Sequence, residues 1–376
     1  MSGDEAPSLF ERITLPSIPK EVGRKISQLE QEFVRAEIEQ LRKQIPVLRP
    51  LYARRNALVA SKELQEADFW PRVFANAPQE IDEYILATDA AVIGQCLKNL
   101  TVERCDVDEN GNGGDPRSVR FTFDFATGEE NPYFTDAQLV KEFHYRTKVT
   151  KTPKGKRHVW EGYVSTPVRI NWKKDQDLTK GLLDAACDLY EAEQKKGAGV
   201  DRTTLPEFEK LVTKLGEAEA DALVGDDDEE ADDENVPSGV SFFNWFGYRG
   251  NSVTAEESAK ADKEEAERWQ KIENGEKVDD DEDDEDDDDD DEDDDDIDED
   301  EESLSTVEIF PAADDIAVTL AEEVWPNALK YYVQSYEVAD DFDDEMDIEE
   351  FDDDEDDEEE EDEEDGEDRP AKKVKT

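Results

Sequence analysis

The sequence predicts an α+β fold: an antiparallel sheet covered by helices, one long N-terminal helix for dimerisation, and disordered acidic tracts. An apolar stripe at helical spacing begins near Ile18 and continues for more than forty residues. Between residues 100 and 172, four segments alternate apolar and polar side chains, as half-buried strands do. Three nearly pure runs of Asp and Glu lie outside these regions. They cannot bury apolar surface, so we expect them to be disordered.

The long helix is expected over residues 18–64, after a flexible N-terminal segment, residues 1–17. Its apolar residues recur in steps of three and four, with one skip in phase near Ala36. A stripe of this length exceeds ordinary globular helices and cannot be buried within one chain, so it predicts a coiled-coil-like homodimer. Pro46 and Pro50 each remove a backbone hydrogen bond, which predicts a kink or a short break. The expected dimer contacts are Val22, Ile26, Leu29, Phe33, Ile38, Leu41, Ile45 and Leu48.

The sheet domain is expected over residues 65–338. Its first part, residues 79–98, is typical of one or two short helices. Strands are predicted at Leu100–Arg104, Ser118–Phe125, 139–150 and 157–172. The turn-rich loop NGNGGDP separates the first two strands and resembles a phosphate loop only superficially, so we interpret it as a hairpin turn. Further helical segments are expected at 178–215, 252–277 and 316–325, the last of them interrupted at Pro326.

The acidic tracts span residues 226–234, 279–302 and 340–368 and together hold 55 acids without any Lys or Arg. The net charge of the whole chain is −64, so the remaining residues carry only −9. Extreme acidity is therefore a property of the tracts and not of the folded part. A polyanion repels free nucleic acid, so these tracts predict a partner protein rich in Lys and Arg.

No catalytic, metal or cofactor site is predicted, and we expect no enzyme. Three cysteines (Cys96, Cys105 and Cys187) have long, unequal spacings, which favours free thiols in a reducing compartment over a disulfide framework or a zinc site. His144 lies in a predicted strand and is interpreted as structural. The acidic runs lack the spacing of a calcium-binding loop. The N-terminus has no pattern of a secretory signal, and no apolar stretch is long enough to cross a membrane.

Two basic clusters stand out against this acidity. One is expected at the third hairpin, where it either contacts DNA without sequence specificity or forms a solvated turn: Lys148, Lys151, Lys154, Lys156 and Arg157. The other ends the acidic tail, residues 339–376, and consists of Arg369, Lys372, Lys373 and Lys375. A short basic cluster of this kind is typical of a segment that an import receptor binds, although it could simply be solubilising. We take it to predict a nuclear protein, with shuttling to the cytoplasm as an option.

Five motifs in a fixed order carry a resemblance to a known family. They are LRPLYARRNALVASKELQEADFW (48–70), ENPYFTDAQLVKEFHY (130–145), INWKKDQDLTKG (170–181), SFFNWF (241–246) and DDIAVTLAEEVWPNALKYY (314–332). In this order, and followed by an acidic tail, they resemble the nucleosome assembly protein family, and within it the SET branch of histone chaperones. The resemblance covers residues 18–335. The segments 182–237 and 247–313 are longer than in the family and are interpreted as insertions.

The resemblance implies a headphone-shaped dimer in which two α/β earmuff domains bind core histones. By motif match, the histone-binding positions are Tyr133, Asp177, Asn244, Gly247 and Asp314. Charge and helix face add Asp315, Glu322 and Glu323 to this set. One family contact in the last helix is usually acidic, but the residue here is Val318. The aromatic residues of SFFNWF are interpreted mainly as domain core.

These expectations predict an ATP-independent histone chaperone that promotes nucleosome assembly and disassembly. The alternative is a SET-like regulator that masks histone tails from acetylation or inhibits a protein phosphatase. A luminal calcium-buffering protein is a third reading. It is disfavoured by the N-terminus and by the basic C-terminal segment.

Overall fold

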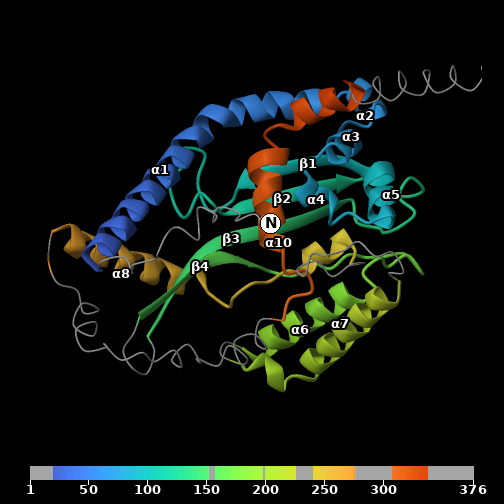
Figure 1. Cartoon of the computed structure of the whole chain (residues 1–376). Helices are drawn as coiled ribbons and strands as arrows, with labels where there is room; N and C mark the ends of the chain where they lie inside the picture. Colours follow the sequence, from blue (N-terminus) through green and yellow to red (C-terminus); the bar gives the residue numbers. More distant parts are fainter. Residues whose placement is uncertain are drawn as a thin grey trace, which may run out of the picture.

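The computed structural model describes residues 20–151, 157–197, 200–225, 240–274, 276 and 307–337, and it confirms the α+β fold (Figure 1). One sheet of four antiparallel strands has the order β1-β2-β3-β4 within these residues. The strands are β1 (Leu97–Arg104), β2 (Val119–Phe125), β3 (Gln138–Lys151) and β4 (Arg157–Ser165). The predicted flexible N-terminus, the acidic tracts and the C-terminal basic segment lie outside the described residues.

The N-terminal helix α1 (Lys20–Val59) is a single element of 40 residues. It passes through Pro46 and Pro50 without a break, which was one of the two predicted outcomes, and it curves along its length (Figure 1). Its C-terminal half is anchored to its own domain, because the Arg55 guanidinium lies 4.2 Å from the ring centroid of Trp325 and donates to the Trp325 carbonyl. The helix therefore continues through both prolines while the domain holds one of its faces.

The β1–β2 loop supports α1 where Pro46 weakens it. Pro46 has no N–H to donate to the Arg42 carbonyl four residues earlier. That carbonyl instead faces Gly111, at which a Cβ atom would lie only 2.4 Å from the Arg42 oxygen. The Arg42 side chain donates to the carbonyls of Gly111 (2.9 Å) and Gly114 (2.7 Å). The predicted hairpin turn is thus a docking element for the long helix.

This close approach leads to a stability prediction. Replacing Gly111 by Ala places a Cβ against backbone and imposes a side chain at φ +81°. Gly128→Ala is a matched control, since φ is +69° there but nothing lies within 4 Å of the added Cβ. We expect the control to lower the free energy of unfolding by about 1–2 kcal/mol, and Gly111→Ala to lower it by about 1–3 kcal/mol more. Denaturant unfolding of both variants measures this difference, and equal losses would show that the loop does not press on α1.

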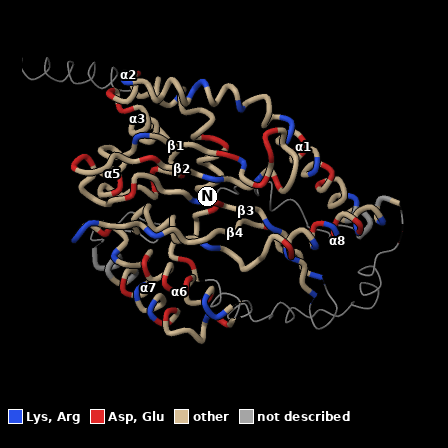
Figure 2. The backbone as a smooth tube through the Cα atoms, turned by 180° about the vertical axis from the view of Figure 1, so that it is seen from behind, with Lys and Arg blue, Asp and Glu red and all other residues tan. Residues whose placement is uncertain are grey.

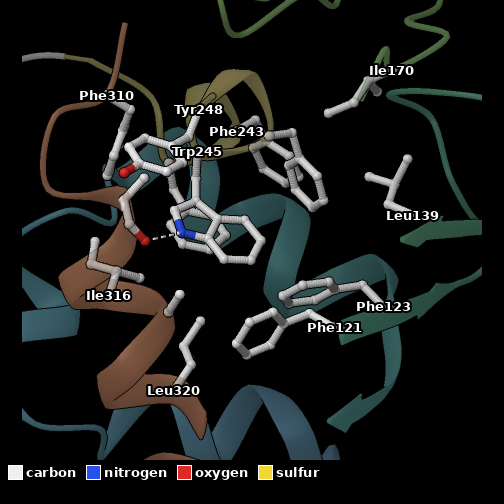
Figure 3. Packing of buried hydrophobic residues seen from close by; sticks show 14 of the residues in the cluster. Phe121, Phe123, Leu139, Ile170, Phe243, Trp245, Tyr248, Phe310, Ile316 and Leu320 are labelled. Carbon is white, nitrogen blue, oxygen red and sulfur yellow. Dashed lines mark hydrogen bonds between the residues drawn. The ribbon is translucent and has the colours of Figure 1, made fainter. Parts of the chain in front are cut away.

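The core lies between the sheet and the last helix. Residues 119, 121, 123 and 125 of β2 are buried in strict alternation, as predicted. The short helix η2 (Phe242–Gly247) places Trp245 against Phe121 and Phe123, with ring centroids 5.3 and 5.9 Å apart. The Trp245 indole N–H donates to the Ala313 carbonyl (2.8 Å), which joins η2 to the final helix (Figure 3). The aromatic motif is therefore core, as the spacing indicated.

The fourth strand ends at Ser165, seven residues before the predicted end. Beyond it the chain turns to the η2 segment, where the Ser165 and Val168 amides donate to carbonyls of Arg249 and Phe246. The ammonium of Lys141 reinforces this junction by donating to the carbonyls of Thr166, Phe246 and Tyr248. Burial lowers the pKa of Lys141 to about 7. β4 therefore ends where the backbone amides donate to carbonyls of residues 246–249 instead of to β3.

Helices surround this core on several sides. The short ones that follow α1 are α2 (Lys62–Glu66), α3 (Phe69–Ala75), α4 (Gln79–Asp82) and α5 (Ala87–Cys96). The described part of segment 182–237 folds as a helical pair, α6 (Leu182–Lys196) and α7 (Pro206–Gly225), joined by η1 (Arg202–Thr204). Segment 247–313 contains α8 (Ala255–Glu273), which lies along β3, where Ser258 Oγ accepts from the Thr147 amide (2.9 Å). None of the described helices has the length and apolar character of a membrane span.

Candidate functional site

The final helical segment carries four of the eight predicted contact residues. It begins with α10 (Ala313–Thr319), continues as a π-helical turn, η5 (Leu320–Val324), and resumes as a helix over 328–337. The Trp325 amide donates to the Leu320 carbonyl (2.9 Å), five residues back, and Pro326 has no amide to continue the α-helical ladder. The helix is interrupted at Pro326, as predicted, and the turn just before it is the wider π-helical turn η5. Apolar residues of this segment face the core: Ile316, Ala317, Leu320 and Val324.

The opposite side of this segment forms what we call the α10 acidic face, defined by Asp314, Asp315, Glu322 and Glu323. Asp315 and Glu322 are exposed, whereas Asp314 and Glu323 are half-buried. Burial raises the pKa of Asp314 above its ordinary value. Glu322 lies 3.3 Å from an Arg104 nitrogen. Glu323 accepts from the Tyr331 hydroxyl (2.6 Å). The face therefore combines two solvent-facing carboxylates with two that are held by the fold.

Tyr133 and Asp177 form a second group, on loops outside the sheet. The Tyr133 carbonyl accepts from the Lys173 amide (2.7 Å), so the two motif loops meet. The Tyr133 ring is half-buried. The Asp177 carboxylate accepts from both the amide (2.9 Å) and the hydroxyl (2.6 Å) of Thr179. Asp177 thus stabilises its own turn as well as contributing charge.

Asn244 and Gly247 are not surface residues. Asn244 is 1% exposed, and its side-chain N–H donates to the Ser241 carbonyl (3.3 Å). A Cβ at Gly247 would lie 2.3 Å from Ile309 Cδ1. Neither residue can touch a partner in this conformation: Asn244 bonds within its own turn, and Gly247 packs against Ile309 and Leu183. This corrects their assignment as direct contacts: a motif match identifies η2, but it cannot tell which of its residues reach the surface.

The predicted dimer residues divide between two faces of α1. Val22, Ile26, Leu29 and Phe33 are 43–61% exposed. Ile38, Leu41, Ile45 and Leu48 are only partly exposed and lie on a different face, because the stripe changes phase near Ala36. The exposed face continues through Val47, Leu51 and Leu58, which the sequence reading left out. Leu29 and Val47 are 18 residues apart, or five full turns, so they lie on the same side. The exposed apolar side chains thus form two groups on one side of α1, with polar residues such as Gln40 and Gln44 between them.

Three of the five predicted basic hairpin residues are described, and they differ in their exposure to solvent. Lys154 and Lys156 lie outside the described residues. Arg157 forms an ion pair with Glu265 of α8, and its side chain is 11% exposed. Lys148 is half-buried and Lys151 is exposed. Across the described elements generally, Lys and Arg are interspersed with Asp and Glu (Figure 2).

The sequence of this chain matches a known protein family and is similar to several proteins of known name. The family model described as nucleosome assembly protein (NAP) matches residues 17–335. A Schizosaccharomyces pombe protein named as a nucleosome assembly protein is 34% identical over 155 residues, which are 41% of this chain and 58% of that protein. Protein SET of Drosophila melanogaster is 30% identical over 135 residues, 36% of this chain and 42% of that protein. The chain spans about half the length of the curated relatives it matches.

Solved structures of low sequence identity also align with the chain. A crystal structure of a Ccp1 mutant is 21% identical and covers 86% of this chain and 98% of that chain, with a TM-score of 0.46. A crystal structure of Vps75 is 18% identical and covers 85% of this chain and all of that chain, with a TM-score of 0.43.

Proposed function

The chain belongs to the nucleosome assembly protein family, and from this premise we propose that it is an ATP-independent histone chaperone. It binds core histones and promotes nucleosome assembly and disassembly without catalysing a reaction. The observation that carries the proposal is the α10 acidic face, which presents two solvent-facing carboxylates and two half-buried ones on a segment that Trp245 joins to the aromatic core. The same chain carries 55 further acids in its three tracts.

Two kinds of negative charge act at different strengths. An exposed ion pair contributes only about 0–1 kcal/mol, so the tracts hold a basic protein through many weak, exchanging contacts. The α10 acidic face includes two carboxylates, Asp314 and Glu323, that are half-buried, and Glu323 is also held by the Tyr331 hydroxyl. Contacts to such carboxylates lose less side-chain entropy on binding. We propose that the face sets the orientation of the histone and that the tracts screen the remaining charge. DNA, with its higher charge density, then displaces the chaperone from the histone.

A direct experiment measures binding of the purified full chain to each core-histone pair at stated salt, together with nucleosome assembly on DNA in the absence of ATP. We expect tight, salt-dependent binding and assembly without nucleotide. Absence of binding at physiological salt, or an absolute requirement for ATP, contradicts the proposal.

Similarity to Protein SET supports a second candidate, the regulator that masks histone tails from acetylation or inhibits a protein phosphatase. A histone held on the α10 acidic face would be shielded from modifying enzymes by the same contacts. Adding the chain to free histones with an acetyltransferase, and separately to a phosphatase without histones, distinguishes masking from direct inhibition.

Nuclear import through Arg369, Lys372, Lys373 and Lys375 is part of the same proposal. Non-specific DNA contact would rely on Lys148 and Lys151 among the described residues.

The acidic tail leads to a prediction about its role. Deleting residues 339–376 should leave the Tm of the domain almost unchanged, because the tail's composition cannot support a core. Histone affinity should fall, and the deficit should shrink as salt rises, since exposed charges are screened over about 10 Å at 0.1 M salt. Thermal unfolding and a salt series of binding measurements test both parts. A large drop in Tm would show that the tail includes a structured segment.

A further inference from the structure

A thiol, a carboxylate and an imidazole meet on the side of the sheet facing away from η2. Cys105 and Asp106 directly follow β1, and His144 lies on β3. His144 Nδ1 is 2.9 Å from Asp106 Oδ1 and 3.9 Å from Cys105 Sγ. The three potential ligand atoms all lie within 4.8 Å of one another. All three side chains are partly shielded but reachable, with His144 26% exposed and Asp106 19% exposed.

This spacing is close to that of a tetrahedral zinc site. Zn²⁺ binds thiolate sulfur at about 2.3 Å and imidazole nitrogen or carboxylate oxygen at about 2.0–2.2 Å, which places neighbouring ligand atoms roughly 3.3–3.6 Å apart. The observed separations of 2.9 and 3.9 Å lie on either side of that range. Shifts of a few tenths of an ångström would therefore bring the imidazole nitrogen to ligand spacing from each of its two partners. The thiol and the carboxylate, which lie within 4.8 Å of each other, would close around the same ion, with water as the fourth ligand.

The surroundings supply the outer shell that such a site requires. Glu142 Oε2 lies 3.3 Å from the far nitrogen of His144, Nε2, where a carboxylate fixes the orientation of a metal-bound imidazole. Arg146 donates to Asp106 Oδ2 (2.8 Å) and leaves Oδ1 directed at the ring. Arg120 pairs with the other oxygen of Glu142 (2.5 Å). Two of the three ligands are thus held by partners outside the triad, His144 by Glu142 and Asp106 by Arg146.

We propose that Cys105, Asp106 and His144 bind one Zn²⁺ ion, with Glu142 as the positioning carboxylate. Binding displaces the thiol proton and a ring proton, so a dication replaces two protons and the net charge of the cluster does not change. The mixed sulfur and nitrogen donors select a transition metal over Mg²⁺ or Ca²⁺, which prefer oxygen ligands. This separates the site from the acidic tracts, whose carboxylates attract Mg²⁺ and Ca²⁺.

The position of the site indicates what the ion would stabilise. Residues 105–118 form the loop that docks on α1 through the contacts of Arg42, and Arg49 also pairs with Glu109 of this loop (2.8 Å). A metal joining the start of the loop to β3 would restrain it where it leaves the sheet. This role does not depend on histone binding.

Cobalt titration of the reduced full chain tests the proposal, with excess Mg²⁺ present to occupy the acidic tracts. We expect one Co²⁺ per chain with a thiolate-to-metal charge-transfer band, which Zn²⁺ abolishes by displacement. Cys105→Ser should remove the band, whereas Cys187→Ser, a change at a buried thiol on α6, should keep it. Glu142→Gln should weaken affinity about 10- to 100-fold with the band retained.

Circular dichroism and the oligomeric state of each variant show whether it remains folded. The proposal is overturned if no charge-transfer band forms in the wild-type chain. It is equally overturned if Cys105→Ser keeps the band while folded, or if bound cobalt is released by Mg²⁺ alone, which would assign it to the acidic tracts. If Cys105→Ser fails to fold, His144→Gln replaces it, with a loss of cobalt affinity of at least tenfold expected.

Discussion

Replacing Leu29 and Phe33 together by Asp is expected to convert a dimer into monomers at micromolar concentration. Both side chains are more than half exposed in the single chain and lie on the apolar stripe of α1. Each apolar side chain that becomes buried contributes about 1.5–3 kcal/mol. A symmetric dimer loses each contact twice, so the double change removes about 6 kcal/mol or more, over four orders of magnitude in Kd.

Light scattering and sedimentation measure this change directly. Ser27→Asp with Gln31→Asp is the matched control, since it adds the same charge at the same four-residue spacing on another face of α1. The control should stay dimeric. A second pair, Val47→Asp with Leu51→Asp, tests the extension of the exposed stripe and should also release monomers. The dimer proposal fails if the wild-type chain has the mass of one chain, or if both Asp pairs and the control behave alike.

Neutralising the α10 acidic face is expected to weaken histone binding at least tenfold, or about 1.4 kcal/mol. The variant combines Asp315→Asn, Glu322→Gln and Glu323→Gln, which keep side-chain shape while removing three charges. Asp177 is left intact because it stabilises its own turn, and Asp314 because burial raises its pKa. Glu323 is half-buried as well, but a Gln at this position keeps an oxygen that can accept from the Tyr331 hydroxyl. Contacts to positioned carboxylates cost more to lose than contacts to tract charges, since the partner's cations are left unpaired in a partly dehydrated interface.

The matched control removes three exposed charges from α8 by Glu256→Gln, Asp262→Asn and Glu264→Gln. Both triple variants are made in the full chain and in a chain lacking residues 339–376. We expect the α10 variant alone to lose affinity in each background, with the Tm and the dimer unchanged. If the α8 control loses as much, net charge explains the binding. If neither loses affinity, the histone surface lies elsewhere.

Periodic patterns predicted the elements of this fold well. Alternation in residues 119–125 and helical spacing after residue 18 each extend over many positions, so local sequence reports them reliably. The predicted end of β4 was wrong, and of the kink or short break predicted in α1 the break is absent, for a shared reason. The end of β4 depends on carbonyls near residue 246, and the continuity of α1 at Pro46 coincides with the loop at Gly111. Both partners are distant in sequence, so no local pattern contains them.

The candidate site differs in the same way between what the sequence predicted and what the structure shows. The sequence by itself determined the family, the acidic tracts and which helix carries the carboxylates. Only the tertiary structure decided that Asn244 and Gly247 are buried, and that the exposed stripe of α1 continues through Val47 and not through Ile45. It also brought Cys105 and His144, 39 residues apart, to 3.9 Å. A spacing pattern defines the faces of an element, but which face is covered depends on what the remainder of the chain packs against it.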